Sequence, residues 1–312
     1  MYHWLYDCNT KLMEKILITG SNGLLGQQLI KDLSPKENYE VFGLSASENQ
    51  NNPGDFQFLR CDITQKQELA EIFRKIDPQI VIHTAVMGSP DACEKDRIKA
   101  WDINVEATDQ IAKLCRLNNS HLVHLSTDFI FDGLSGPYVE DDEPNPANYY
   151  GLTKLESEKS VSDILPEATI LRTVLVYGMH AHMTRANILT RILQAGKNNQ
   201  AMQIASDQFR TPTFLSDLSE ACIQAAQIKP KGVFHISGNE MMSVYEMAVK
   251  IARYFHVPDQ LIQPIPSLLL NESARRPSKT GFITQKARET LDYRPKTLEE
   301  GLKIIANQYN II

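Results

Sequence analysis

The sequence predicts an α/β protein, built as a doubly wound parallel sheet of the Rossmann type with a smaller C-terminal domain. Three observations predict it. Short β-branched segments alternate with helical ones from Lys15 to Ser126, which indicates parallel strands covered by helices on both faces. A glycine-rich turn follows the first of these strands. The alternation loosens after Tyr177, which indicates that a second unit begins there.

The elements follow one another in a regular order. After a strand at residues 15–19 and a helix that ends at Leu33, further strands are expected at residues 39–44, 57–61, 79–85, 121–126 and 232–237. Further helices are expected at residues 65–75, 98–118, 187–196 and 215–227, with one that ends at Phe255 and two short ones after it. The segment 215–237 is expected to return to the sheet. The Rossmann domain then comprises residues 13–178 and about 206–240, and the smaller domain about 179–205 and 241–312.

Composition excludes several classes of protein. The 312 residues hold 32 Lys plus Arg against 38 Asp plus Glu, and a net charge of −6 gives no sign of a nucleic-acid surface. Five cysteines without C-x-x-C spacing predict no disulfide framework and fit a reducing compartment, the cytoplasm. No apolar run approaches the roughly 18 residues that a membrane span needs. Residues 1–12 are expected to be an extension without signal-peptide character.

The glycine-rich turn is the sequence GSNGLLG, with Gly20, Gly23 and Gly26. Its spacing differs from G-x-G-x-x-G, but it offers the same features: a tight turn, close approach of backbone to a pyrophosphate, and close packing of helix on strand. The amino end of the following helix then faces the phosphates with free N–H groups. The pattern predicts a dinucleotide site, with an ordinary strand-to-helix turn as the alternative.

A second stretch supplies candidate catalytic groups. Tyr150 and Lys154 are spaced to lie on one face of an expected helix, and the preceding strand ends in Ser126 and Thr127. Open sheets bind ligands at the carboxyl ends of their strands, so these side chains are expected to meet. The ammonium is expected to lower the pKa of the phenol, so that Tyr150 can exchange a proton with a carbonyl oxygen held by Thr127. The Tyr-x-x-x-Lys spacing alone is common by chance, and its surroundings give it weight.

Those surroundings include CDIT, IHTAV, NVEAT, STDFIFDG, YGLTKLESE, LRTVLVYG and ARRP. With them the chain resembles the extended short-chain dehydrogenase/reductases, and among these the dTDP-4-dehydrorhamnose reductase branch, which also includes the regulatory β subunit of methionine adenosyltransferase. The resemblance runs from about Met13 to the carboxyl end. It implies that Thr127, Tyr150 and Lys154 are the catalytic residues.

The resemblance also implies binding residues. Asp62 would meet the adenine, and Asn104 would brace the strand that carries the catalytic hydroxyl. The whole implied cofactor set is Gly20, Asn22, Gly23, Leu24, Leu25, Gly26, Ser45, Asp62, Ile63, Thr84, Ala85, Val86, Asn104, Tyr150 and Lys154. The expected substrate set is Met87, Asp128, Phe129, Arg210 and Arg276, whose arginines could pair with a diphosphate. Arg210 stands where the family tends to have Gly, which puts the identity of the substrate in question.

The residues after the second strand decide between the two pyridine nucleotides. An acid there binds the ribose diol of NAD, whereas a basic or small polar residue admits the 2′-phosphate of NADP. This chain offers Ser45, Ala46 and Ser47, with no Arg or Lys nearby in sequence and Glu48 as the only acid. The expected cofactor is therefore NADP or NAD, with NADP favoured.

Histidines give no sign of a metal site. His180 and His182 are the only cluster and have no third ligand nearby, so no bound metal is expected. The histidines at positions 83, 121, 124 and 235 lie in or beside apolar segments and are expected in the core or at its edge.

The expected function is that of an NAD(P)-dependent oxidoreductase acting on a CH–OH or keto group. The resemblance points to a reductase of a 4-keto nucleotide-sugar, with dTDP-4-dehydrorhamnose as its example. Two alternatives stay open: an epimerase or dehydratase of the same family, and a non-catalytic, NADP-binding regulatory subunit like the β subunit named above. A nucleotide-sugar is the expected partner, and the sequence leaves a homodimer open.

Overall fold

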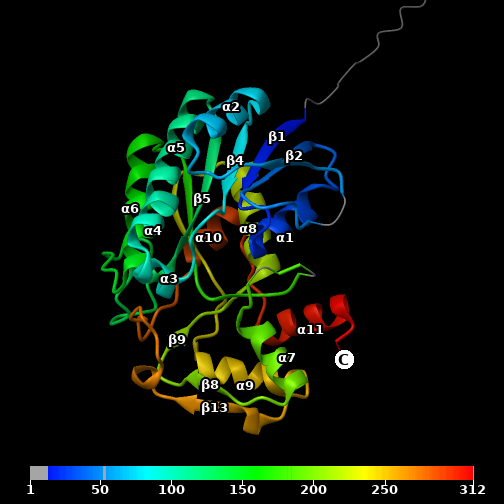
Figure 1. Cartoon of the computed structure of the whole chain (residues 1–312), viewed down its shortest axis with the longest axis vertical. Coiled ribbons are helices and arrows are strands. Elements are labelled where there is room, and N and C mark those ends of the chain that lie inside the picture. Colours follow the sequence, from blue (N-terminus) through cyan, green and yellow to red (C-terminus); the bar gives the residue numbers. More distant parts are fainter. Residues whose placement is uncertain (1–12, 52–53, 181, 184, 312) are drawn as a thin grey trace, which may run out of the picture.

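The computed structural model describes residues 13–51, 54–180, 182–183 and 185–311, so the expected extension lies outside the described residues. Seven parallel strands form the central sheet in the order β11-β6-β5-β4-β1-β2-β3 (Figure 1). The strand order reverses between β1 and β4, as in the Rossmann type, and the predicted fold class is confirmed. The strands are β1 (Glu14–Thr19), β2 (Tyr39–Ser45), β3 (Gln57–Arg60), β4 (Ile80–His83), β5 (His121–Thr127), β6 (Thr169–Thr173) and β11 (Gly232–Ile236).

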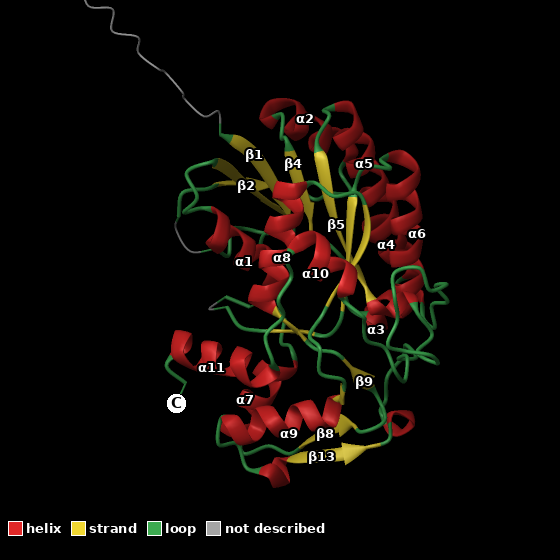
Figure 2. Cartoon of the chain, turned by 180° about the vertical axis from the view of Figure 1, so that it is seen from behind, coloured by secondary structure: helices red, strands yellow, loops and turns green. Residues whose placement is uncertain are grey.

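Helices cover both faces of this sheet. In β1, Ile16 and Ile18 pack into the core on one face and Leu17 into the core on the other, as expected of a strand buried on both sides. Figure 2 shows α1, α8 and α10 together on the near face. They span Leu24–Leu33, Leu215–Ile228 and Gln285–Leu291, and the far face carries α2 (Lys66–Ile76), α5 (Ala107–Leu117) and α6 (Tyr149–Ile164). The expected return of segment 215–237 is confirmed, because β11 pairs with β6.

A second, smaller core lies beyond the carboxyl ends of the strands (Figure 1). Ile192, Ile251 and Ile305, one from each of three helices, are buried in it. Its elements are α7 (Ile188–Asn198), α9 (Val244–Tyr254), α11 (Leu298–Tyr309) and the parallel pair β8 (Met202–Ala205) with β13 (Ile262–Ile265). Two short pairs lie between the cores: β7 (Val176–Tyr177) with β10 (Thr213–Phe214), and β9 (Phe209–Arg210) with β12 (Met242–Ser243). Although it follows α9 in the chain, α10 packs in the core of the sheet.

One expected helix differs from the prediction. Instead of a single helix at residues 98–118, the chain forms α4 (Arg97–Trp101), a π-helical turn (Asp102–Glu106) and α5. A short helix that was not expected, α3 (Pro90–Lys95), precedes them. In the π-helical turn, Asn104 accepts a hydrogen bond from the Met87 N–H at 2.8 Å and donates one to Thr153 Oγ1 at 3.0 Å. These contacts to distant residues hold the extra residue of the turn, which the periodicity of the sequence cannot reveal.

Two further observations bear on the sequence analysis. Among the described residues, no helix combines the length and the apolar character needed to cross a membrane. The cysteines at positions 61, 93, 115 and 222 are buried free thiols. Short 3-10 turns complete the fold at Asp128–Ile130, Asp259–Leu261 and Ser267–Leu269.

Candidate active site

A pocket of about 790 Å³ lies at the carboxyl ends of β1, β2, β4 and β5, where the strand order reverses. Most of the residues expected to bind the cofactor line it: Gly20, Asn22, Gly23, Leu24, Leu25, Ser45, Asp62, Ile63, Thr84, Ala85, Val86, Tyr150 and Lys154. Gly26 and Asn104 are outside its lining and support it from behind. The structure thus brings the two sequence stretches to one cavity, and their part in cofactor binding stays a prediction.

The glycine-rich turn forms one wall of the pocket. Gly20 has a φ of +71°, and a Cβ there would lie 2.7 Å from the backbone N of Ala85. A Cβ on Gly26 would overlap the carbonyl oxygen of Gly20. Glycine is therefore required at both positions, one for the turn and one for the close packing of α1 on it. Gly23 caps α1, so the amino end of this helix faces the pocket and offers N–H groups suited to phosphate.

Asn22 joins this turn to the segment after β2. Its amide donates to Ser47 Oγ at 2.9 Å and to the Glu48 carbonyl at 2.7 Å, while the Gln50 N–H donates to Asn22 Oδ1 at 2.9 Å. Asn22 is buried. The walls that would hold the pyrophosphate and the adenosine ribose are therefore held together before any ligand binds.

Helix α6 carries Tyr150 and Lys154 into the pocket. Asn148 caps its amino end by accepting from the Gly151 N–H at 2.9 Å. A Cβ on Gly151 would overlap the carbonyl oxygen of Phe129, so the first turn of α6 lies directly against the chain that leaves β5. The Phe129 ring meets the Tyr150 ring edge-on, with centroids 5.9 Å apart. These contacts place the phenol at the end of β5.

The pKa values differ from the sequence expectation. Burial raises the pKa of Tyr150 above its usual value, and the Thr127 hydroxyl opposes this only in part. The expected lowering of this pKa by Lys154 is not found. Burial instead lowers the pKa of Lys154 to about 8, with Glu158 opposing it, and Lys154 Nζ lies 3.1 Å from His124 Nε2. Tyr150 is thus a protonated phenol at neutral pH, which suits a proton donor.

The end of β5 supplies two hydroxyls. Thr127 Oγ1 donates to Asp128 Oδ1 at 3.2 Å and accepts from the Phe129 N–H at 3.2 Å. Ser126 lines the pocket, and its buried Oγ has no hydrogen-bond partner among the described residues. A buried hydroxyl without a partner is costly, so this oxygen is available to a ligand. Sequence reasoning noted Ser126 at the strand end but did not include it in the site.

The expected substrate residues lie away from the pocket lining. Arg210 Nε lies 3.6 Å from Asp128 Oδ2, and its guanidinium donates to the Pro277 carbonyl at 2.8 Å. Arg276 is paired with Asp91 at 2.5 Å. The other two, Met87 and Phe129, contact Asn104 and Tyr150. Because both arginines already have anionic partners, their pairing with a diphosphate stays a prediction that this geometry does not support.

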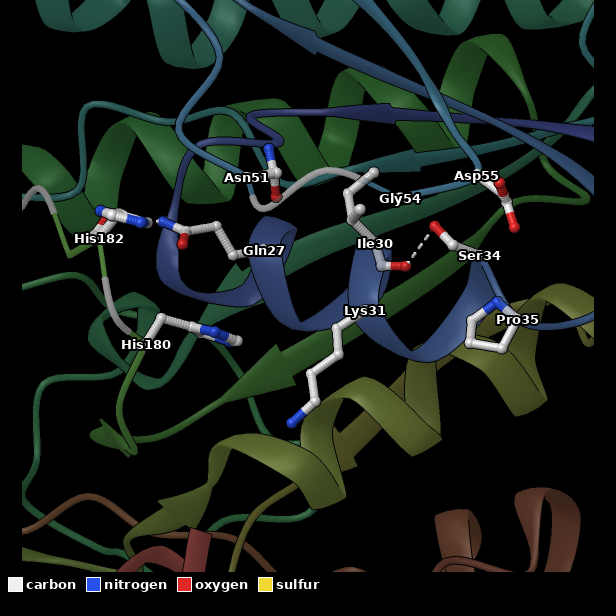
Figure 3. Close-up of a pocket in the computed structure, with 10 residues that line it drawn as sticks. All are labelled: Gln27, Ile30, Lys31, Ser34, Pro35, Asn51, Gly54, Asp55, His180 and His182. Atoms are coloured by element: carbon white, nitrogen blue, oxygen red, sulfur yellow. Dashed lines mark hydrogen bonds between the residues drawn. The ribbon is translucent and has the colours of Figure 1, made fainter. Parts of the chain in front are cut away.

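A smaller pocket of about 320 Å³ lies beside α1 and includes the histidine cluster (Figure 3). Gln27 points toward His182 and donates to its carbonyl at 2.9 Å. Burial and Lys31 lower the pKa of His180 to about 4, so this ring is neutral at pH 7. Among the described residues, no three His, Cys, Asp or Glu side chains are grouped to hold a metal ion.

The chain is similar to known proteins along almost its whole described length. The family described as RmlD substrate binding domain matches residues 13–311. The chain belongs to this family. The resemblance that the motifs indicated is thereby confirmed.

The relatives of this RmlD family member include proteins with different names. Methionine adenosyltransferase 2 subunit beta of Bos taurus is 32% identical over 80% of this chain and 75% of its own length. The dTDP-4-dehydrorhamnose reductase of Aggregatibacter actinomycetemcomitans is 29% identical over 94% of this chain and 98% of its own length. The crystal structure of dTDP-4-dehydrorhamnose reductase from Bacillus anthracis in complex with NADP has a TM-score of 0.86 and 28% identity, covering 95% of this chain and all of that one.

Several pocket residues of this RmlD family member were missed by sequence reasoning. Lys99, Arg185 and Asn187 line the pocket, together with Met183, Thr173 and Val176. Asn187 caps α7 through a capping box, a pattern that the sequence does show. Lys99 and Arg185 carry no local motif, because they reach the pocket only through the packing of distant segments.

Proposed function

We propose that this chain is an NAD(P)H-dependent reductase of a 4-keto nucleotide-sugar, with dTDP-4-dehydrorhamnose as the first substrate to test. One observation carries the proposal: Tyr150 and Lys154 open into the same pocket as the glycine-rich turn and the amino end of α1. The reductases among the chain's relatives support the same reading. The smaller core, which is built on α7, α9, α11 and the pair of β8 with β13, would bind the nucleotide-sugar.

The glycine-rich turn, Tyr150 and Lys154 would hold a nicotinamide nucleotide, which would supply a hydride for the keto carbon. Tyr150 donates its phenolic proton to the keto oxygen, and the raised pKa of this phenol keeps the proton in place until the oxygen becomes basic. Thr127, with Ser126 beside it, holds that oxygen by a hydroxyl. Lys154, whose pKa of about 8 leaves it mostly charged at pH 7, opens into the same pocket and would hold the ribose of the cofactor.

The test is steady-state oxidation of NADPH by the purified chain with dTDP-4-dehydrorhamnose. Tyr150→Phe removes the proton donor and is expected to lower kcat by about 10²–10⁴-fold. Tyr149→Phe is the matched control, because Tyr149 lies at the start of the same helix with Arg97 over its ring, 4.9 Å from the centroid. Turnover by Tyr150→Phe equal to that of the wild type would remove the mechanism.

A second function is favoured by a specific finding. Relatives at 30–33% identity are named methionine adenosyltransferase 2 subunit beta, and such a protein could retain the dinucleotide pocket without turnover. Purified chain that binds NADP, reduces no keto sugar and raises the activity of a methionine adenosyltransferase would establish this alternative. Interconversion of sugar epimers without net oxidation of NADPH would instead indicate an epimerase.

A further inference from the structure

We infer that Arg60 recognises the 2′-phosphate of NADP and gives this chain a preference for NADP over NAD. The inference rests on the proposed function in one respect, since it requires a pyridine dinucleotide in the pocket. It does not require any particular sugar substrate.

The pairing of β2 with β3 brings Arg60 close to the expected position of the 2′-phosphate. In doubly wound folds the 2′ position of the adenosine ribose lies near the end of the second strand. Here Ser45 ends that strand, and Ser45, Ala46 and Ser47 line the pocket. The Cα partner of Ser45 across the sheet is Arg60, the last residue of β3. The cation that is missing from the sequence after β2 is therefore supplied by the neighbouring strand.

The side chain of Arg60 lies along the segment that follows β2. Its Nε is 3.4 Å from the carbonyl oxygen of Ala46, and its Nη1 is 2.5 Å from Glu48 Oε1. Asn22 fixes the backbone of this segment from the other side through Ser47 and Glu48. The guanidinium thus lies beside an immobilised part of the pocket rim.

Arg60 forms an ion pair with Glu48, the only nearby acid that could favour NAD. Glu48 is the acid that could otherwise bind a ribose diol, but its carboxylate is turned to Arg60. Side-chain exposures of 63% for Arg60 and 75% for Glu48 leave this pair in solvent, where such pairs are weak. A phosphate monoester carries about −1.5 to −2 charges and accepts two parallel bonds from a guanidinium, so it is the stronger partner. An incoming 2′-phosphate is therefore expected to replace the carboxylate of Glu48.

The test measures the binding of NADP⁺ and NAD⁺ to the full chain by titration calorimetry. Arg60→Gln is expected to raise the Kd for NADP⁺ by about 10–100-fold, the loss of a bidentate charged contact, and to change that for NAD⁺ by less than about threefold. The same comparison with 2′-phospho-ADP-ribose and ADP-ribose isolates the phosphate from the nicotinamide. Arg253→Gln is the matched control, because Arg253 has 69% exposure, pairs with Asp259 and lies on α9, away from the pocket lining.

Glu48→Gln provides the opposite change. It frees the guanidinium and is expected to tighten NADP⁺ binding severalfold while NAD⁺ binding stays the same, and it carries the test should Arg60→Gln fail to fold. Equal NADP⁺-to-NAD⁺ ratios in the wild type and Arg60→Gln would overturn the inference. Wild-type chain that binds neither dinucleotide would overturn the proposed function as well. Chain that binds NADP⁺ through Arg60 but reduces no keto sugar would overturn the proposed function alone.

Discussion

The buried ammonium of Lys154 takes part in the proposed catalysis and also affects the free energy of unfolding. The side chain is 3% exposed, and burial brings the pKa of its ammonium down to about 8 from its ordinary value of 10.5. The folded chain therefore holds this proton less tightly than the unfolded chain does. Below pH 8 the buried charge opposes folding in full, and the penalty disappears as the pH rises from 8 to 10.5.

Replacing this lysine is expected to abolish activity and to make the fold more stable. Lys154→Met should abolish turnover and raise the free energy of unfolding at pH 7 by about 1–3 kcal/mol, the upper value being the pKa shift converted by linkage. The gain should shrink to less than about 1 kcal/mol at pH 10. Urea unfolding at both pH values measures it. A variant less stable than the wild type at pH 7 would show that the contact with His124 outweighs the cost of burial.

Individual residues also show how much of the candidate site could be predicted from the sequence. Tyr150 and Lys154 could be found because their helical spacing is local, and Thr127 because it ends a recognisable strand. The environment of each group could not be found, since it comes from distant segments: His124 beside Lys154, Asp128 beside Arg210, and Glu48 with Arg60. A sequence shows which residues carry charge but not which partners neutralise it.

At the scale of elements, the amino end of α6 determines where the phenol lies. Asn148 caps it through the Gly151 N–H, and its close contact with the chain after β5 depends on the absence of a side chain at Gly151. The boundaries of several elements, among them β2, α2 and α8, were predictable to within one residue from periodicity and glycine turns. The π-helical turn was not, because Asn104 is held there by residues far away in the sequence.

Gly151→Ala is expected to shift this helix away from β5. Overlap of the new methyl with the Phe129 carbonyl should cost about 1–3 kcal/mol of stability and lower kcat by displacing Tyr150. Gly196→Ala is the control: its Cβ would meet Val257 at 2.6 Å in the smaller core, so stability should fall while kcat is kept. Thermal unfolding measures the loss of stability, and kcat is measured at a temperature below the unfolding transitions of both variants. Full kcat in Gly151→Ala would contradict the role given to this contact.

At the scale of the molecule, residues 274–280 fasten the smaller core to the sheet. Arg276 pairs with Asp91 of α3, the Ala274 N–H donates to the same carboxylate at 2.9 Å, and Asn148 donates to the Arg275 carbonyl at 2.8 Å. Burial acts to raise the pKa of Asp91, but these hydrogen bonds and Arg276 lower it overall. The pair joins the segment 274–280 to α3.

Arg276→Ala is expected to loosen this attachment. The variant should lose about 1–2 kcal/mol of stability and raise the KM for the nucleotide-sugar more than the KM for NADPH, since the dinucleotide pocket lies on the sheet side. Arg253→Ala breaks an exposed pair within the smaller core and should change neither. Equal effects on both KM values would show that the pair acts on the whole fold rather than on the orientation of the cores.

The late position of β11 in the sequence affects how the sheet forms during synthesis. β6 ends at Thr173, but its outer neighbour begins at Gly232, after α7, β8 and α8 have been made. Because synthesis adds about 5–20 residues per second, the outer edge of β6 stays unpaired for seconds before β11 is made. Nascent chains of this protein are therefore expected to need protection by a chaperone until the last strand arrives.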